Sequence, residues 1–90
     1  MSSRIGFTVH GQVIGVNFRS FTTRKAKELG VTGWVQNTDD GKVAGQAQGD
    51  ETALDSFVKA INNGPPAAHV VKVEKEEQDV VSGESSFVTK

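Results

Sequence analysis

Two segments of this sequence carry apolar residues on a single helical face, and this pattern most limits what the chain can fold into. The first stripe has spacings of four, four and three residues and consists of Phe18, Thr22, Ala26 and Leu29. The second stripe consists of Leu54, Phe57, Val58 and Ile61. A helix with one apolar stripe must bury it against another layer. We therefore expect two helices that lie on one face of a sheet.

The segments around these stripes have the features of strands. Ile5, Phe7 and Val9 alternate with small or polar residues, the period of a half-buried strand. Turn residues 39–41 (Asp-Asp-Gly) join two extended segments into a hairpin. The expected strands are 5–10, 31–38, 43–48, one that begins at 70, and a short one at 85–89.

This order of elements defines a fold class. It is α+β, a ferredoxin-like split β-α-β-β-α-β sandwich with two helices on one face of a four- to five-stranded antiparallel sheet. The sequence contains no repeat, linker or low-complexity segment. We therefore expect a single domain over residues 1–90.

Residue types at the helix ends predict where the helices begin and end. Asn17 precedes the first stripe and is a natural N-cap, and Gly30 follows it where a left-handed C-terminal cap is expected. Asp50 competes with the Thr52/Asp55 pair to cap the second helix.

Composition and charge limit the kinds of ligand and cofactor that we expect this protein to bind. Ten basic and eleven acidic residues give a net charge of −1, which provides no broad positive field for nucleic acid or anionic lipid. There is no cysteine, and His10 and His69 are the only histidines, so we expect no metal site and no cofactor. Residues 1–4 lack the apolar stretch of a secretory leader, and no run is long enough to span a membrane. We expect a cytoplasmic monomer.

The segment from Gly11 to Arg19 joins the first strand to the first helix and is the strongest candidate for a site. Its two glycines allow positive φ, so that successive N–H groups can point inward and bind an anion at the helix start. Arg19 lies in the first helical turn, where the helix dipole disfavours a cation unless an anion is bound. An exposed arginine beside an ordinary glycine turn explains the same pattern.

Asn37 is the second candidate. It shares the parity of Val31 and Val35, so its carboxamide points to the helix side of the sheet at one end. An amide can accept a proton from water through its oxygen and donate through its nitrogen, which allows it to orient an attacking water. An asparagine that hydrogen-bonds its own backbone beside a turn is the alternative.

An ordered set of residues across nearly the whole chain resembles the acylphosphatase family. The matching positions are Gly11, Val13, Gly15, Val16, Phe18, Arg19, Thr22, Ala26, Leu29, Gly30, Gly33, Trp34, Val35, Asn37, Asp40, Gly41, Val43, Gly49, Phe57, Gly64 and Pro65. The resemblance implies hydrolysis of acyl phosphates without metal or cofactor, in the fold described above.

The resemblance also implies roles for individual residues. It implies that Arg19 binds the substrate phosphate, and that Asn37 positions the nucleophilic water. The backbone amides implied to bind phosphate with Arg19 belong to Ile14, Gly15, Val16, Asn17, Phe18 and Arg19. One position departs from the family, because Ile14 stands where a glutamine is usual. A backbone amide can still bind phosphate there, but any role of the glutamine side chain in loop shape or rate is lost.

Two other functions are compatible with this fold. An RNA-binding module of the RRM type has the same order of elements, but it requires aromatic residues on its central strands and a basic surface. A non-catalytic domain that binds a small anion is the second alternative. His10 has the opposite parity to Val9 and is expected on the open face of the sheet, without a catalytic role.

Overall fold

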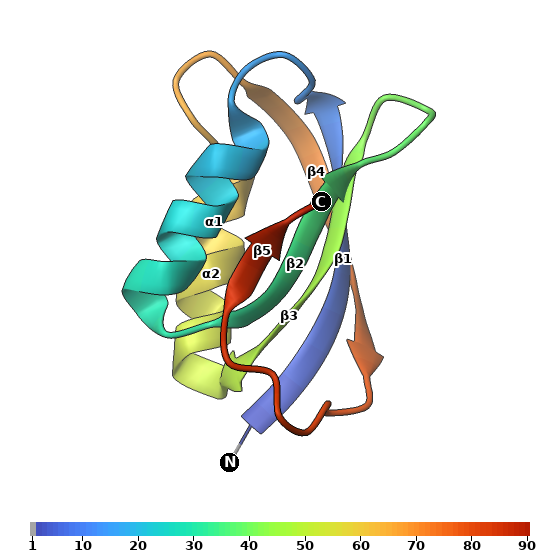
Figure 1. Cartoon of the computed structure of the whole chain (residues 1–90). Coiled ribbons are helices and arrows are strands. Elements are labelled where there is room, and N and C mark those ends of the chain that lie inside the picture. Colours follow the sequence, from blue (N-terminus) through green and yellow to red (C-terminus); the bar gives the residue numbers. More distant parts are fainter. Residues whose placement is uncertain (1) are drawn as a thin grey trace.

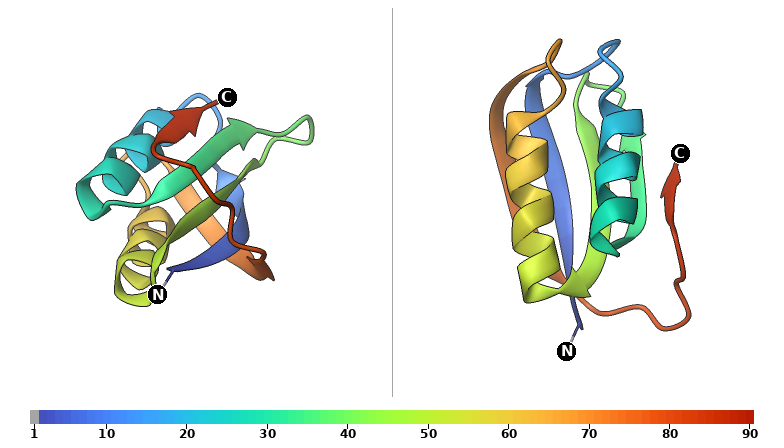
Figure 2. Two further views of the ribbon diagram at one scale, coloured as in Figure 1. Left: turned by 60° about the horizontal axis from the view of Figure 1, so that its bottom comes forward. Right: turned by 90° about the vertical axis from the view of Figure 1, so that its left-hand side faces the viewer.

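The computed structural model describes residues 2–90 as two helices packed on one face of a five-stranded sheet (Figures 1 and 2). The elements are β1 (Ser2–Gln12), α1 (Phe18–Leu29), β2 (Thr32–Asn37), β3 (Val43–Asp50), α2 (Glu51–Asn63), β4 (His69–Gln78) and β5 (Phe87–Thr89). The strands lie side by side in the order β4-β1-β3-β2-β5. The ferredoxin-like fold predicted from the sequence is confirmed.

The strand directions match the prediction for four strands and differ for the fifth. β1 pairs antiparallel with β3 and β4, and β2 pairs antiparallel with β3. β5 instead runs parallel to β2, with Gly33 opposite Phe87. After β4 the chain reverses and crosses to the far edge of the sheet, and this brings it back in the direction of β2 (Figure 2). The expectation of a wholly antiparallel sheet is therefore wrong for this strand.

The core lies between the helices and the sheet. The ring of Phe57 on α2 packs edge-on against Phe7 at 5.5 Å between centroids, and against Phe87 at 5.8 Å. Both predicted stripes face this core: Phe18, Thr22, Ala26, Leu54, Phe57 and Ile61 are buried, and Leu29 and Val58 are partly buried against it. Burial of Phe87 fastens the short β5 to the same core.

Two of the predicted helix caps are confirmed by the structure, and one is wrong. Gly30 caps α1 with φ of 71°, and the Asp50 carboxylate caps α2 by accepting from the Ala53 N–H at 2.8 Å. Asn17 is the residue before α1, but its side chain makes no capping hydrogen bond. Side-chain capping requires an extended backbone, whereas Asn17 is left-handed with φ of 67°. The predicted side-chain cap is therefore wrong, because the loop curls at this residue.

Within residues 2–90, neither helix has the length and apolar character needed to cross a membrane.

Candidate active site

The end of β1 that leads into the loop pairs with β4 alone and contains a glycine that no other residue can replace without strain. Gly11 has φ of 134°, and a Cβ on it would lie 2.1 Å from the carbonyl oxygen of His69 on β4. The β1–β4 register shifts between His10 and Gly11. This irregularity turns the chain out of the sheet and into the loop.

The rest of the loop is curled by two left-handed residues, Gly15 with φ of 76° and Asn17 with φ of 67°. Within residues 2–90, the backbone N–H groups from Ile14 to Ser20 donate no hydrogen bond to the protein. The first turn of α1 contains no acidic residue. Phe18 is buried and anchors the start of the helix under the loop. The segment therefore presents free N–H donors at a helix start, which is an anion-binding arrangement.

Arg19 and Asn37 line one cavity with this loop, although they come from different elements. The cavity has a volume of about 370 Å³ and is lined by Val13, Gly15, Asn17, Phe18, Arg19, Ser20, Asn37 and Thr89. Four of the six residues predicted to bind phosphate therefore line it, namely Gly15, Asn17, Phe18 and Arg19. Ile14 and Val16 do not line it, and the Ile14 side chain is 45% exposed.

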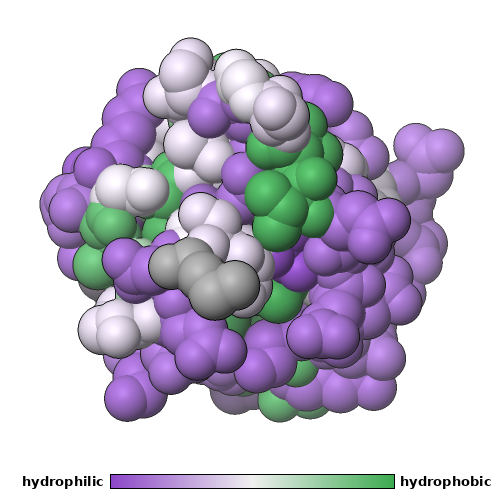
Figure 3. Space-filling model, turned by 90° about the horizontal axis from the view of Figure 1, so that it is seen from below, coloured by the Kyte–Doolittle hydropathy of each residue, from purple (hydrophilic) through white to green (hydrophobic). Residues whose placement is uncertain are grey.

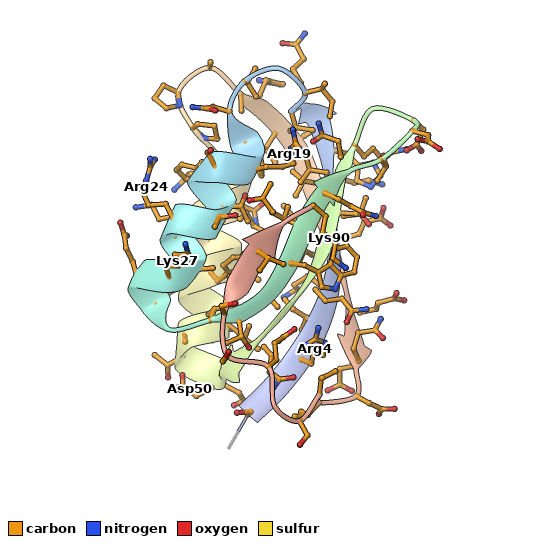
Figure 4. All side chains as sticks on the ribbon, viewed as in Figure 1. Arg4, Arg19, Arg24, Lys27, Asp50 and Lys90 are labelled. Atoms are coloured by element: carbon orange, nitrogen blue, oxygen red, sulfur yellow. The ribbon has the colours of Figure 1, made fainter. Side chains whose placement is uncertain are left out.

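The C-terminal residues contribute to this cavity, and the sequence analysis missed them. Arg19 Nη1 donates to the main-chain oxygen of Lys90 at 2.9 Å (Figure 4). The hydroxyl oxygens of Thr23 on α1 and Thr89 on β5 are 2.8 Å apart. Nothing local in the sequence reports these contacts, because they depend on the pairing of β5 with β2.

Asn37 is the last residue of β2 and is exposed at the mouth of the cavity. Val31 and Val35 are buried toward the helices, so the parity argued from the sequence is confirmed. The turn that follows is ordered by Thr38, whose N–H donates to the Lys42 carbonyl at 2.8 Å. Hydrogen bonds from the Lys42 ammonium and the Thr38 hydroxyl lower the pKa of Asp40 to about 2. A well-bonded turn therefore holds the strand end that carries Asn37.

The groups at the cavity define its chemistry. The lining residues supply one guanidinium, the carboxamides of Asn17 and Asn37, two hydroxyls and backbone N–H donors, all of which suit an anion. Among residues 2–90 no three His, Cys, Asp or Glu side chains lie close enough together to hold a metal ion. His10 contacts the Glu74 carboxylate and does not line the cavity.

Comparisons with known proteins identify the family. The acylphosphatase family model matches residues 5–89. The chain belongs to the acylphosphatase family. The acylphosphatase of Salinibacter ruber is 40% identical over 84 residues, which cover 93% of this chain and 88% of that protein. The acylphosphatase of Thermotoga petrophila is 55% identical over 69 residues, which cover 77% of each chain. The crystal structure of acylphosphatase from Bacillus subtilis aligns with a TM-score of 0.93 at 38% identity, and the alignment covers 100% of this chain and 99% of that one.

A second hollow of about 370 Å³ lies on the open face of the sheet. Glu74 and Glu76 line it together with Lys75 and Trp34, so the charged lining residues sum to one negative charge. Carboxylates repel a phosphate, so this hollow does not suit the substrate of the acylphosphatase family. The cavity at the start of α1 is therefore the candidate active site.

Proposed function

We propose that this chain hydrolyses the carboxyl–phosphate bond of small acyl phosphates to a carboxylate and inorganic phosphate, in the cavity at the start of α1. One observation carries the proposal. Gly15, Asn17, Phe18 and Arg19, whose backbone N–H groups donate to no residue within 2–90, line the same cavity as Asn37.

The loop and Arg19 bind the phosphoryl group. The N–H groups from Ile14 to Arg19 donate to phosphoryl oxygens, and the helix dipole adds to the attraction. Arg19 uses one N–H for the Lys90 oxygen and keeps others for the substrate. Because these donors are held in place before the substrate arrives, little reorganisation is needed as charge develops.

Asn37 holds the attacking water in line with the leaving oxygen. The water oxygen forms a bond to phosphorus while the bond from phosphorus to the acyl oxygen breaks, and the electron pair leaves with the carboxylate. The carboxylate is a good leaving group and needs no general acid. The water proton passes to an oxygen of the substrate's own phosphoryl group, so no histidine is required. Positioning and charge stabilisation suffice for such a loose transition state.

The RNA-binding alternative is not favoured. On the open face, the ammonium of Lys90 lies 4.4 Å from the centroid of the Trp34 ring and covers the aromatic surface on which a base would stack. Carboxylates line the hollow beside it. A monomeric state, a cytoplasmic location, and the absence of nucleic-acid or membrane partners stay predictions from the sequence.

Arg19→Ala tests the proposal most directly. We expect it to lower kcat by about 10³-fold and to weaken competition by inorganic phosphate, because the guanidinium contacts the phosphoryl group before and during the reaction. Arg24→Ala is the matched control, since Arg24 lies on the same helix and does not line the cavity. Equal activity of the two variants contradicts the proposal.

Asn37→Ala separates water positioning from binding. We expect kcat to fall about 10²-fold while the inhibition constant of inorganic phosphate changes little, because the carboxamide orients water and not phosphate. A steady-state assay on a simple aromatic acyl phosphate measures both quantities. Retention of near-full turnover contradicts the role of Asn37, and chelators should have no effect on either enzyme.

A further inference from the structure

Arg4 is a buried cation that the reaction does not use. It lies on β1 on the open face of the sheet, and only 3% of the residue is exposed. Its Nε donates to Gln46 at 2.7 Å and its Nη1 to Gln48 at 3.0 Å. The two Nη atoms also donate to the two carboxylate oxygens of Glu84, at 2.8 and 3.2 Å. We call these four residues the Arg4 cluster.

The Arg4 cluster fastens the connection between β4 and β5, residues 79–86, to the sheet. Gln48 Nε2 donates to the Val81 carbonyl at 2.9 Å, and the Val81 N–H donates back to Gln48 at 2.8 Å. The connection runs across the end of the molecule opposite the candidate active site (Figures 1 and 2). The polar cluster therefore ties this segment to β1 and β3.

Apolar contacts offer this connection little support. Val80 and Val81 are 53% and 45% exposed. Seen from this end, the molecule is largely hydrophilic, with apolar side chains in small separate areas (Figure 3). The connection contains no helix or strand of its own. The position of the connection therefore depends on its polar bonds more than on burial.

The connection leads directly into β5, which reaches the active site. β5 has three residues and forms the edge of the sheet beside β2. Beyond it, the Lys90 N–H donates to the Val35 carbonyl at 2.8 Å, and the Lys90 oxygen accepts from Arg19 at 2.9 Å. A three-residue strand forms few backbone bonds of its own, so its docking depends on the buried Phe87 and on the bonds of the residues on both sides of it.

We propose that Arg4 is a positioning residue for Arg19. By holding Glu84 and the connection against the sheet, it keeps β5 docked on β2, and docked β5 presents the Lys90 oxygen that orients the Arg19 guanidinium. Without Arg4, β5 opens more often and Arg19 is correctly placed for a smaller fraction of the time. The catalytic consequence rests on the proposed function, because it assumes that Arg19 binds the substrate.

Arg4→Met is the first test, with Lys25→Met as the control. Lys25 is a cation on α1 that forms an exposed ion pair with Glu28 at 3.6 Å. In Arg4→Met we expect hydrogen exchange at the Lys90 amide to rise at least tenfold and KM to rise several-fold with kcat nearly kept. Substrate binding still selects the docked state, so only the apparent affinity falls. Arg19→Ala, in contrast, should lose both turnover and phosphate affinity.

A disulfide that bypasses the Arg4 cluster is the decisive test. The hydroxyl oxygens of Thr23 and Thr89 are 2.8 Å apart and the chain has no cysteine, so Thr23→Cys/Thr89→Cys places two thiols within bonding reach. Added to Arg4→Met, the oxidised disulfide should bring exchange and KM to the values of the oxidised Thr23→Cys/Thr89→Cys protein, and reduction should abolish both effects. The Thr23→Cys/Thr89→Cys protein that keeps Arg4 is the reference in both redox states.

The outcomes separate the two proposals. Unchanged exchange and KM in Arg4→Met, or a raised KM that the oxidised disulfide does not correct, overturns the positioning role. Full activity of Arg19→Ala overturns the proposed function, whatever Arg4→Met does. Should Arg4→Met fail to fold, Glu84→Gln replaces it. This variant keeps the hydrogen bonds from Arg4 to Gln46 and Gln48 and removes only the carboxylate of residue 84. Unchanged exchange and KM in folded Glu84→Gln then overturn the proposal.

Discussion

The loop at residues 13–17 and the connection at residues 79–86 are both irregular segments, at opposite ends of the molecule, but they are stabilised in opposite ways. Backbone geometry shapes the loop, with left-handed Gly15 and Asn17, and its N–H groups donate to no acceptor in the part of the chain that the structure describes. Side chains hold the connection, where Arg4 and Gln48 bond to Glu84 and Val81. The difference teaches that the unpaired backbone donors lie at the candidate binding site, whereas the paired polar groups belong to the scaffold.

Gly11→Ala should produce the largest loss of stability. Its Cβ would overlap the His69 carbonyl at 2.1 Å, and backbone atoms of β4 cannot rotate out of the way. We expect a loss of about 4 kcal/mol or more in the free energy of unfolding, measured by urea denaturation. Gly15→Ala is the matched control, because nothing lies within 4 Å of its Cβ and only the left-handed φ costs about 1–2 kcal/mol. Equal losses would contradict the distinction between these two glycines.

Arg4→Met should produce the next largest loss. It leaves the Glu84 carboxylate, whose side chain is 18% exposed, without its guanidinium partner. We expect a loss of about 2–3 kcal/mol in the free energy of unfolding, at the low end for a buried ion pair because Glu84 keeps some contact with water. The Lys25→Met control should change it by less than about 0.5 kcal/mol. A loss no greater than that of the control would show that the connection does not depend on Arg4.

Acid should weaken the connection before the loop. The hydrogen bonds from Arg4 lower the pKa of Glu84 from its ordinary 4.5. Because the folded-state pKa is the lower one, the stabilisation is present above pH 4.5 and is lost as pH falls through the folded value. In urea denaturation between pH 6 and about pH 2, Glu84→Gln should therefore lose less stability than the wild type. Glu28→Gln, an exposed control on α1, should keep the full pH dependence.

Ile14→Gln should have the smallest effect on stability and a selective effect on rate. The Ile14 side chain is 45% exposed and does not line the cavity, so we expect the free energy of unfolding to change by less than about 0.5 kcal/mol. The N–H of residue 14 is kept, so phosphate inhibition should be unchanged, while loop dynamics or turnover shift. Unchanged turnover and unchanged loop relaxation by NMR would show that the departure at this position has no consequence.

Much of the fold and the centre of the candidate site were accessible from the sequence. The helical stripes, the glycines of the loop and the parity of Asn37 are local patterns with a direct geometric meaning. The side-chain cap at Asn17 was wrong, because the pattern gives the residue type and not the backbone conformation that the loop imposes. The extent of the chain as one domain over residues 1–90 stays a prediction.

The contribution of the last residues to the candidate site could not be predicted from local sequence patterns. A short strand at 85–89 is predicted from the sequence, but the three residues of β5, Phe87–Thr89, are too few for a period that would indicate which neighbours they contact. Its partner strand and its direction depend on a connection that crosses the molecule, in which Glu84 bonds to Arg4, eighty positions earlier in the chain.

The sequence alone therefore determined the order of elements and placed the glycines of a candidate anion-binding loop just before Arg19, because residue type and side-chain period are local properties. Only the tertiary structure decided that Asn37 and the C-terminal residues border that loop, and that Lys90 contacts Arg19. Such contacts join residues distant in sequence, and their free energy exists only when the whole sheet is assembled.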